Sequence, residues 1–261
     1  MLSKLLKKDL KRDMRWMWIL FVSTIIVACV TYGCKEAGEH ILFFKILAIF
    51  FESVLYSLLV NVILQPFLRS FLNFTKSLYG EEAYLTHTLP VTKNQIITSK
   101  FLTAIIEIVL GFLCLIISLF IAFYSPTLFD TLRLLISTIV VGKFSLFVVI
   151  SLFVLLVIVE FLMFISLIFY SIVVSYRSKE KRVLKTFLLT AGLSFIACTI
   201  LSVVLVGVLS FYGIKLTTTT LILSSSAFLG VMLSGIIVYS VIIVLFYFIT
   251  KKEFNKGVNV D

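Results

Sequence analysis

Long apolar runs separated by short polar stretches dominate the chain. They cover approximately residues 16–32, 41–67, 96–124, 144–176, 186–212 and 221–250. A helix needs ~20 predominantly apolar residues to cross the hydrocarbon core of a bilayer, so each run is a candidate span. The first run is short for this purpose, whereas the second and fourth must tilt, kink or continue into water. The pattern predicts an all-α, polytopic protein with six transmembrane helices, in a single membrane domain covering residues 1–261.

The first fifteen residues have the two-faced pattern of an amphipathic helix. Apolar side chains recur at helical spacing at Leu2, Leu5, Leu6, Leu10, Met14 and Met17. The other face is basic and carries Lys4, Lys7, Lys8, Lys11, Arg12 and Arg15. Such a helix lies in the membrane interface, with Trp16 and Trp18 at headgroup depth. We therefore expect an interfacial helix over residues 1–15, which is also compatible with the charged flank of a signal anchor.

Basic residues are distributed unequally between the two sides of the predicted membrane. With a cytoplasmic N-terminus, 18 of the 23 Lys and Arg residues lie in cytoplasmic segments, four lie outside, and Lys45 falls within the second span. Cytoplasmic loops carry the excess of Lys and Arg, so this bias predicts that both termini are inside. The chain is 61% hydrophobic and 14% charged, which is typical of a membrane protein. The net charge of +10 therefore reflects topology and does not indicate nucleic-acid binding.

The sequence lacks the usual motifs for nucleotide binding and catalysis. Gly142-Lys143 is followed by Phe144, so the chain has no Walker A phosphate loop for ATP. Its two histidines, His40 and His87, do not combine with cysteines or carboxylates at metal-ligand spacing. No nucleophile, base and orienting residue form a recognisable set. We therefore expect no catalytic residue, metal or cofactor in this chain.

Three glutamates fall inside the predicted spans: Glu52, Glu107 and Glu160. A charge at the bilayer centre costs at least ~2.5 kcal/mol, so such residues are candidates for a translocation pathway. The alternative is a structural role, as protonated or hydrogen-bonded groups between helices. Lys45 precedes Glu52 by two helical turns, or ~10 Å, which is too far for a direct pair unless both side chains extend.

Small residues form a stripe on each of the last two predicted spans. At intervals of four residues they share one helix face: Ser194, Cys198 and Ser202 on the fifth span, and Ser226, Gly230 and Ser234 on the sixth. Small side chains let helices approach closely, so these stripes predict helix packing. Between the third and fourth spans, Ser125-Pro126 has helix-start chemistry. The stretch that follows suggests either an outer-leaflet helix or a re-entrant hairpin.

The polar passage over residues 77–95 separates the second and third apolar runs. Gly80 is suited to end a helix, Pro90 interrupts the next segment, and Thr92 with Gln95 forms a capping-box pattern. The passage therefore predicts a short cytosolic helix of about two turns between two longer helices. It would expose Tyr84, Leu85, Leu89 and Val91, which suggests docking to a partner, although a solvated connector is the alternative.

The stretch "EEAYLTHTLPVTKNQIITSK" resembles a segment of six-helix permease subunits of bacterial ABC exporters of the type-2 group. The matching residues are Glu82, Tyr84, Leu85, Thr86, Leu89, Pro90, Val91, Thr92 and Lys100. In that family the segment is the coupling helix, which sits in a groove of a separate ATPase subunit. The resemblance implies ATPase coupling through Glu81, Glu82, Tyr84, Leu85, His87, Leu89 and Pro90.

The resemblance also carries expectations for the whole assembly. Two permeases, identical or homologous, would pair with ATPase subunits that hold ATP and Mg²⁺. The complex would lie in the bacterial cytoplasmic membrane and export amphipathic peptides, such as bacteriocins, or hydrophobic drugs. Eukaryotic relatives carry re-entrant helices between the fifth and sixth spans. Here residues 213–220 form only a short loop, so we expect no large external lid.

Two other functions remain open from the sequence. One is a non-transport membrane protein, such as an immunity protein or a sensor, without an ATPase partner. The other is an ion- or proton-coupled carrier that uses Glu52 and Glu160.

Overall fold

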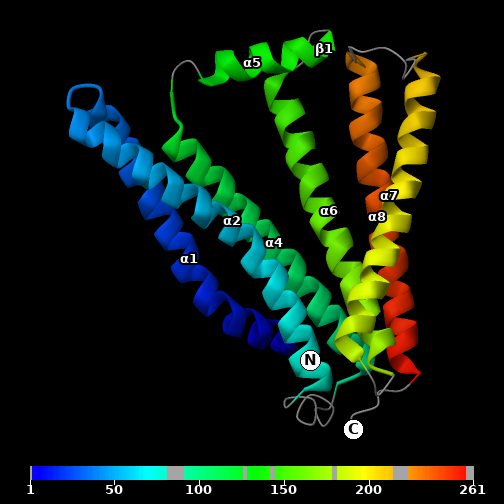
Figure 1. Ribbon diagram of the computed structural model, residues 1–261. Helices are drawn as coiled ribbons and strands as arrows, with labels where there is room; N and C mark the ends of the chain where they lie inside the picture. The colour runs from blue at the N-terminus through cyan, green and yellow to red at the C-terminus, as the bar shows by residue number, and fades with distance from the viewer. Residues whose placement is uncertain are drawn as a thin grey trace. The chain divides into compact units, whose positions relative to one another are not determined.

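The computed structural model describes residues 2–80, 91–125, 128–141, 145–177, 181–213 and 223–256. It is all-helical apart from two two-residue strands. The helices long and apolar enough to cross a membrane are α1 (Leu2–Gly38), α2 (Leu42–Tyr79), α4 (Lys93–Ala122), α6 (Leu146–Ser175), α7 (Arg182–Phe211) and α8 (Ser225–Asn255) (Figure 1). This confirms the predicted all-α membrane protein with six spans.

The long helices extend beyond the expected thickness of a bilayer. They contain 30 to 38 residues. At about 1.5 Å per residue they are about 45–57 Å long, compared with a hydrocarbon core of about 30 Å. In particular, α1 joins residues 2–15 and the first apolar run in one continuous helix. An interfacial position for its first turns remains a prediction.

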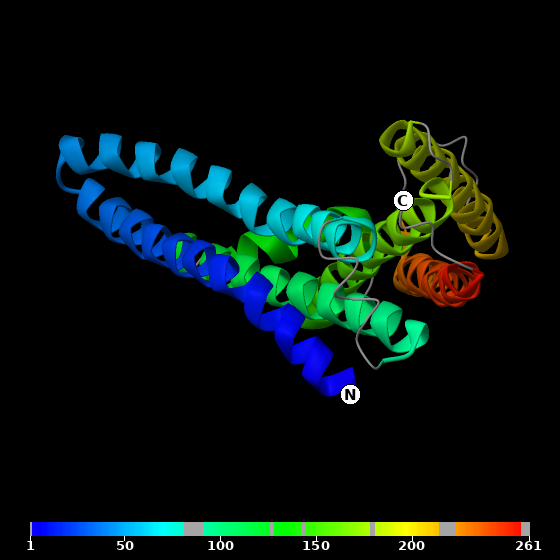
Figure 2. The same ribbon diagram turned by 90° about the horizontal axis from the view of Figure 1, so that it is seen from below.

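The chain divides into two compact units, Met1–Pro126 and Thr127–Asp261, called unit 1 and unit 2 below. In unit 1, α1 and α2 form an antiparallel helical hairpin, and α4 packs against both (Figure 2). The N-terminus, the end of α2 and the start of α4 lie at one end of this unit, and the α1–α2 turn lies at the other (Figure 1). The polar passage is therefore attached to the same end of unit 1 as the N-terminus.

Two apolar clusters hold the three helices of unit 1 together. One joins Met14, Met17 and Phe21 of α1 to Val62 of α2 and Cys114 of α4. The other, nearer the α1–α2 turn, joins Ala28, Leu55, Leu59 and Ala122. All these side chains are buried.

A proline and a glycine bring α2 and α4 close together in the middle of unit 1. Pro66 lies inside α2 and has no N–H, so it cannot donate to the carbonyl oxygen of Val62 one turn earlier. Gly111 of α4 lies against that oxygen, where a Cβ atom would be only 3.1 Å away. The absence of a side chain at Gly111 therefore permits the close contact between the two helices.

Unit 2 is built around α6 and α8. Its core contains Val159, Met163 and Leu167 of α6, Ala197 of α7, and Tyr239 and Ile242 of α8. Only Thr186 and Ala197 are buried on α7, so most of this helix is exposed within the chain. Gly235 of α8 lets this helix pack closely against α6, because a Cβ atom there would lie 2.9 Å from Leu156.

A short helix and a strand pair complete the described part of unit 2. Residues Leu128–Ile139 form α5. This helix lies in the stretch after Pro126, for which the sequence suggested either a helix or a re-entrant hairpin. Strand β1 (Val140–Val141) follows and pairs in parallel with β2 (Leu223–Ser224). The pairing joins the end of α5 to the start of α8.

Candidate coupling site

The structure fixes both ends of the polar passage. Helix α2 ends at Tyr79, and the Gly80 N–H donates to the Lys76 carbonyl oxygen at 3.1 Å. A Cβ atom on Gly80 would lie 2.9 Å from that oxygen, which explains the glycine. At the other end, Thr92 and Gln95 form the predicted capping box. The Gln95 N–H donates to Thr92 Oγ1 at 3.4 Å, and the Thr92 N–H donates to Gln95 Oε1 at 3.3 Å.

The predicted coupling residues themselves fall between these ends. Glu81, Glu82, Tyr84, Leu85, His87, Leu89 and Pro90 lie outside the described residues. Their short helix and their role remain predictions. What the structure adds is the framework around them.

A buried ion pair joins the first turns of α1 to the first turns of α4. Lys100 Nζ lies 2.9 Å from Asp9 Oδ1, and both side chains are 7% exposed. The Ser99 hydroxyl donates to the second carboxylate oxygen of Asp9 at 3.4 Å. Lys100 is eight residues beyond Thr92, so the pair lies about 12 Å along α4 from the capping box.

A second set of polar contacts joins α1 to α2. Arg12 Nε donates to Asp13 Oδ1 at 3.1 Å. Arg69 of α2 donates through Nη1 to the backbone carbonyl oxygen of Asp13 at 3.4 Å, and through Nε to Gln65 Oε1 at 3.0 Å. Arg69 is thus held by its own helix while it contacts the neighbouring one.

Glu107 completes this set between all three helices. Its side chain is fully buried, and the Ser70 hydroxyl of α2 donates to Oε2 at 3.3 Å. The other carboxylate oxygen, Oε1, is buried without a hydrogen-bond partner among the described residues, and Asp13 of α1 lies nearby. These contacts are those expected if Glu107 is a structural residue between helices, the alternative to a pathway role.

These contacts form one polar cluster, which comprises Asp9, Arg12, Asp13, Arg69, Ser70, Lys100 and Glu107. Arg12 joins its two halves, because it lies 3.8 Å from Asp9 and 3.1 Å from Asp13. Burying a charge is costly unless it is paired, so the cluster favours one relative position of its helices. The sequence did not single out Asp9, Asp13 and Arg69, and it indicated Lys100 only as a residue that matches the permease segment. A usable signal was present, because Asp9 and Asp13 are four residues apart and adjoin Leu10 and Met14 on the apolar face of the helix.

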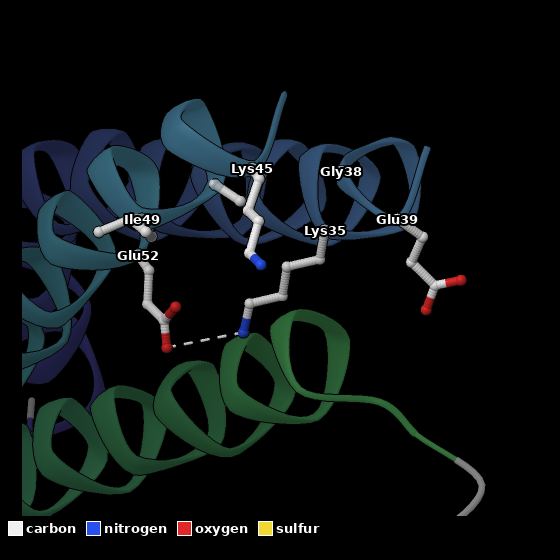
Figure 3. Close-up of a pocket in the computed structure, with 7 residues that line it drawn as sticks. Lys35, Gly38, Glu39, Lys45, Ile49 and Glu52 are labelled. Carbon is white, nitrogen blue, oxygen red and sulfur yellow. Dashed lines mark ion pairs between the residues drawn. The ribbon is translucent and has the colours of Figure 1, made fainter. Parts of the chain in front are cut away.

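Glu52 lies away from the polar cluster, towards the α1–α2 turn. Its Oε1 is 3.6 Å from Lys35 Nζ and accepts a 2.9 Å bond from the Tyr56 hydroxyl. Lys35 also lies 3.9 Å from the centre of the Phe123 ring. The Glu52–Lys35 pair lines a cavity of about 370 Å³ together with Lys45 (Figure 3). Glu52 therefore pairs with Lys35 of α1, on the other helix of the hairpin.

Glu160 belongs to unit 2. Its side chain is half-buried on α6, and its carboxyl group lies near the Tyr239 side chain of α8. Glu52 and Glu107 occupy separate places in unit 1. Within unit 1, Glu52 and Glu107 therefore do not form a common group, and Glu160 is described in unit 2 alone.

The predicted small-residue stripes are only partly buried. Cys198, Ser202 and Ser226 are exposed, whereas Ser194, Gly230 and Ser234 are half-buried. Gly230 adjoins the Tyr212 ring, which a Cβ atom would approach to 2.8 Å. The hydroxyls of the serines at 194, 202 and 234 donate to carbonyl oxygens of their own helices, so an apolar surrounding does not leave them unsatisfied. Their packing role remains a prediction.

Comparison of the chain with known protein families, curated proteins and solved structures gave no match. Among the described residues, no group of His, Cys, Asp and Glu side chains is arranged to hold a metal ion.

Proposed function

We propose that this chain is the transmembrane subunit of an ATP-driven ABC exporter. The observation that carries the proposal is the polar passage, whose sequence resembles the coupling helix of that family. Its ends are sharply defined, by Gly80 on α2 and by the capping box on α4. Such defined helix ends support a short docking element between the two spans.

The polar cluster supports a mechanical role for the passage. A displacement of residues 81–90 acts directly on the start of α4. The buried Asp9–Lys100 pair links that part of α4 to α1, and Arg69 links α1 to α2. We propose that ATP binding by the partner subunits moves the passage. The three helices of unit 1 then shift together between inward-open and outward-open states.

The other subunits of the proposed exporter are separate chains. Two ATPase subunits would hold ATP and Mg²⁺, and a second permease, identical or homologous, would complete the pathway in the bacterial cytoplasmic membrane. The substrate class that the resemblance suggests is an amphipathic peptide or a hydrophobic drug. It would bind between the two permeases.

Co-purification tests the assembly. The chain is co-expressed with the ATPase encoded by a neighbouring gene and extracted in a mild detergent. We expect a stable complex whose ATPase activity the substrate stimulates. Failure to recover any complex would remove the exporter proposal and favour an immunity or sensor protein. Transport that persists without ATP and follows the proton gradient would favour the carrier that uses Glu52 and Glu160.

Two substitutions in the passage test the coupling role. Tyr84→Ala and Leu89→Ala remove the apolar groups expected to dock in the ATPase groove. We expect transport per ATP hydrolysed to fall while the permease remains folded. Leu42→Ala is the matched control, because Leu42 is 74% exposed at the opposite end of unit 1. Unchanged coupling in both passage variants would refute the assignment of the coupling helix.

A further inference from the structure

A cavity of about 420 Å³ lies between α1 and α2, beside the polar cluster. Three of the side chains that line it are basic: Arg12 of α1, and Arg69 and Lys76 of α2. The lining also includes one acidic residue, Asp13, which is buried and accepts a bond from Arg12. The cavity therefore has an excess of positive charge.

The cavity lies at the boundary between the apolar part and the polar end of each helix. On α1, Trp16 starts the apolar run and is 61% exposed beside the cavity. On α2, Leu68 and Leu72 also line it and are about half exposed, while the polar end of the helix starts at Arg69. In a membrane-spanning hairpin this is the level of the lipid headgroups, where tryptophan and basic residues are enriched.

The basic groups are positioned for a ligand with oxygen acceptors. Arg69 is oriented by its bonds to Gln65 and to the Asp13 carbonyl oxygen. A guanidinium presents five N–H donors in a planar fork that suits phosphate, and the two bonds use only part of that capacity. Lys76 is exposed and lies two turns further along the same face of α2.

We infer that this cavity binds the phosphate headgroup of an anionic phospholipid, whose acyl chains extend from Leu68 along the apolar part of α2. Basic pockets between membrane helices bind such headgroups, and each nearby Lys or Arg contributes measurably. The inference rests on the membrane-spanning helices and not on the exporter assignment. The Lys76 end of the cavity lies one turn before Gly80, next to the start of the polar passage.

Lipid binding to the full chain in a neutral detergent tests this. Phosphatidylglycerol and phosphatidylcholine with the same acyl chains are titrated and bound lipid is counted by native mass spectrometry. We expect tighter binding of phosphatidylglycerol. Lys76→Gln should weaken it about fivefold, corresponding to about 1 kcal/mol for one basic residue. Lys11→Gln removes the same charge from an exposed position of α1 that does not line the cavity, and should leave binding unchanged.

Two further arms separate the possible outcomes. Arg69→Gln should also weaken phosphatidylglycerol binding, and its thermal stability without lipid shows whether the loss reflects unfolding. Inorganic phosphate should not displace the lipid at millimolar concentration, and displacement would indicate a site for a free anion. Equal binding of the two lipids, or equal losses in the Lys76 and Lys11 variants, would overturn the inference.

Discussion

Replacing Asp9 by asparagine would leave Lys100 as a buried ammonium group without its carboxylate partner. Both side chains are 7% exposed in the native pair, so water cannot take over the role of the lost charge. The Ser99 hydroxyl can still bond to the asparagine side chain. The substitution thus tests the charge and largely preserves the shape.

The size of the effect follows from the burial of the pair. Removing one member of a buried ion pair costs about 3–5 kcal/mol, because the remaining charge stays desolvated. Removing both, as in Asp9→Asn with Lys100→Met, should restore most of this loss. Buried pairs are often replaced by uncharged residues without net cost. We therefore expect a strongly non-additive double-mutant cycle.

Cys114 provides a local assay of this energy. It is buried among α1, α2 and α4, in the same unit as the ion pair. With the other cysteines replaced by serine, labelling by a thiol reagent reports opening of unit 1. When opening is fast compared with labelling, the rate follows the open population. A loss of 3 kcal/mol then accelerates labelling more than about 100-fold.

The control is an ion pair that is more exposed. Glu253 lies 2.6 Å from Arg177 in unit 2, and the Arg177 side chain is 38% exposed. Exposed pairs contribute about 0–1 kcal/mol, so Glu253→Gln should change Cys114 labelling less than about fivefold. If Asp9→Asn labels no faster than this control, or if the double variant is as unstable as the sum of the single ones, the buried-pair reasoning is wrong.

Other substitutions test separate contacts. Gly111→Val should destabilise unit 1 by about 1–3 kcal/mol in the same labelling assay, because even a Cβ atom there lies 3.1 Å from an α2 carbonyl oxygen. Gly230→Ala should cost less than about 1 kcal/mol in thermal unfolding, since it meets only the end of an exposed tyrosine ring that can turn away. Thr92→Ala should destabilise the start of α4 by about 1 kcal/mol, seen as faster amide exchange there, and Thr92→Ser should restore protection. Glu107→Gln keeps the shape and supplies an amide donor to the neighbouring aspartate, so stability and transport should be retained; loss of transport in a stable protein would instead support a pathway role.

The hydrophobic pattern predicted the membrane-spanning helices, because each helix depends on the residues of its own segment. The six spans follow from the apolar runs, and the two ends of the polar passage follow from local chemistry at Gly80 and Thr92. Each of these features is decided by residues that are close in the sequence. Such features can be predicted without knowing which helices are neighbours.

Pairings between helices could not be predicted in this way. Counting basic residues assigned Lys100 to the cytoplasmic interface, whereas its partner Asp9 is 91 residues away. For Glu52, the sequence offered Lys45 on the same helix, but the nearest cation is Lys35 across the hairpin. The division into two units likewise has no counterpart in composition, since no linker separates them.

The polar cluster, at the end of unit 1 that holds the N-terminus, adds what apolar packing of the membrane-spanning parts lacks. Lipid is as apolar as the helix surfaces, so apolar contacts alone specify the axial position of one helix against another only weakly. Sliding α4 by one turn relative to α1 would move Lys100 about 5.4 Å and break its pair with Asp9. In the proposed exporter, a displacement of the polar passage would therefore move the two helices together. It follows that Asp9→Asn should lower transport per ATP at temperatures where the protein is still folded, whereas Glu253→Gln should not; equal coupling in the two variants would show that force is transmitted by another route.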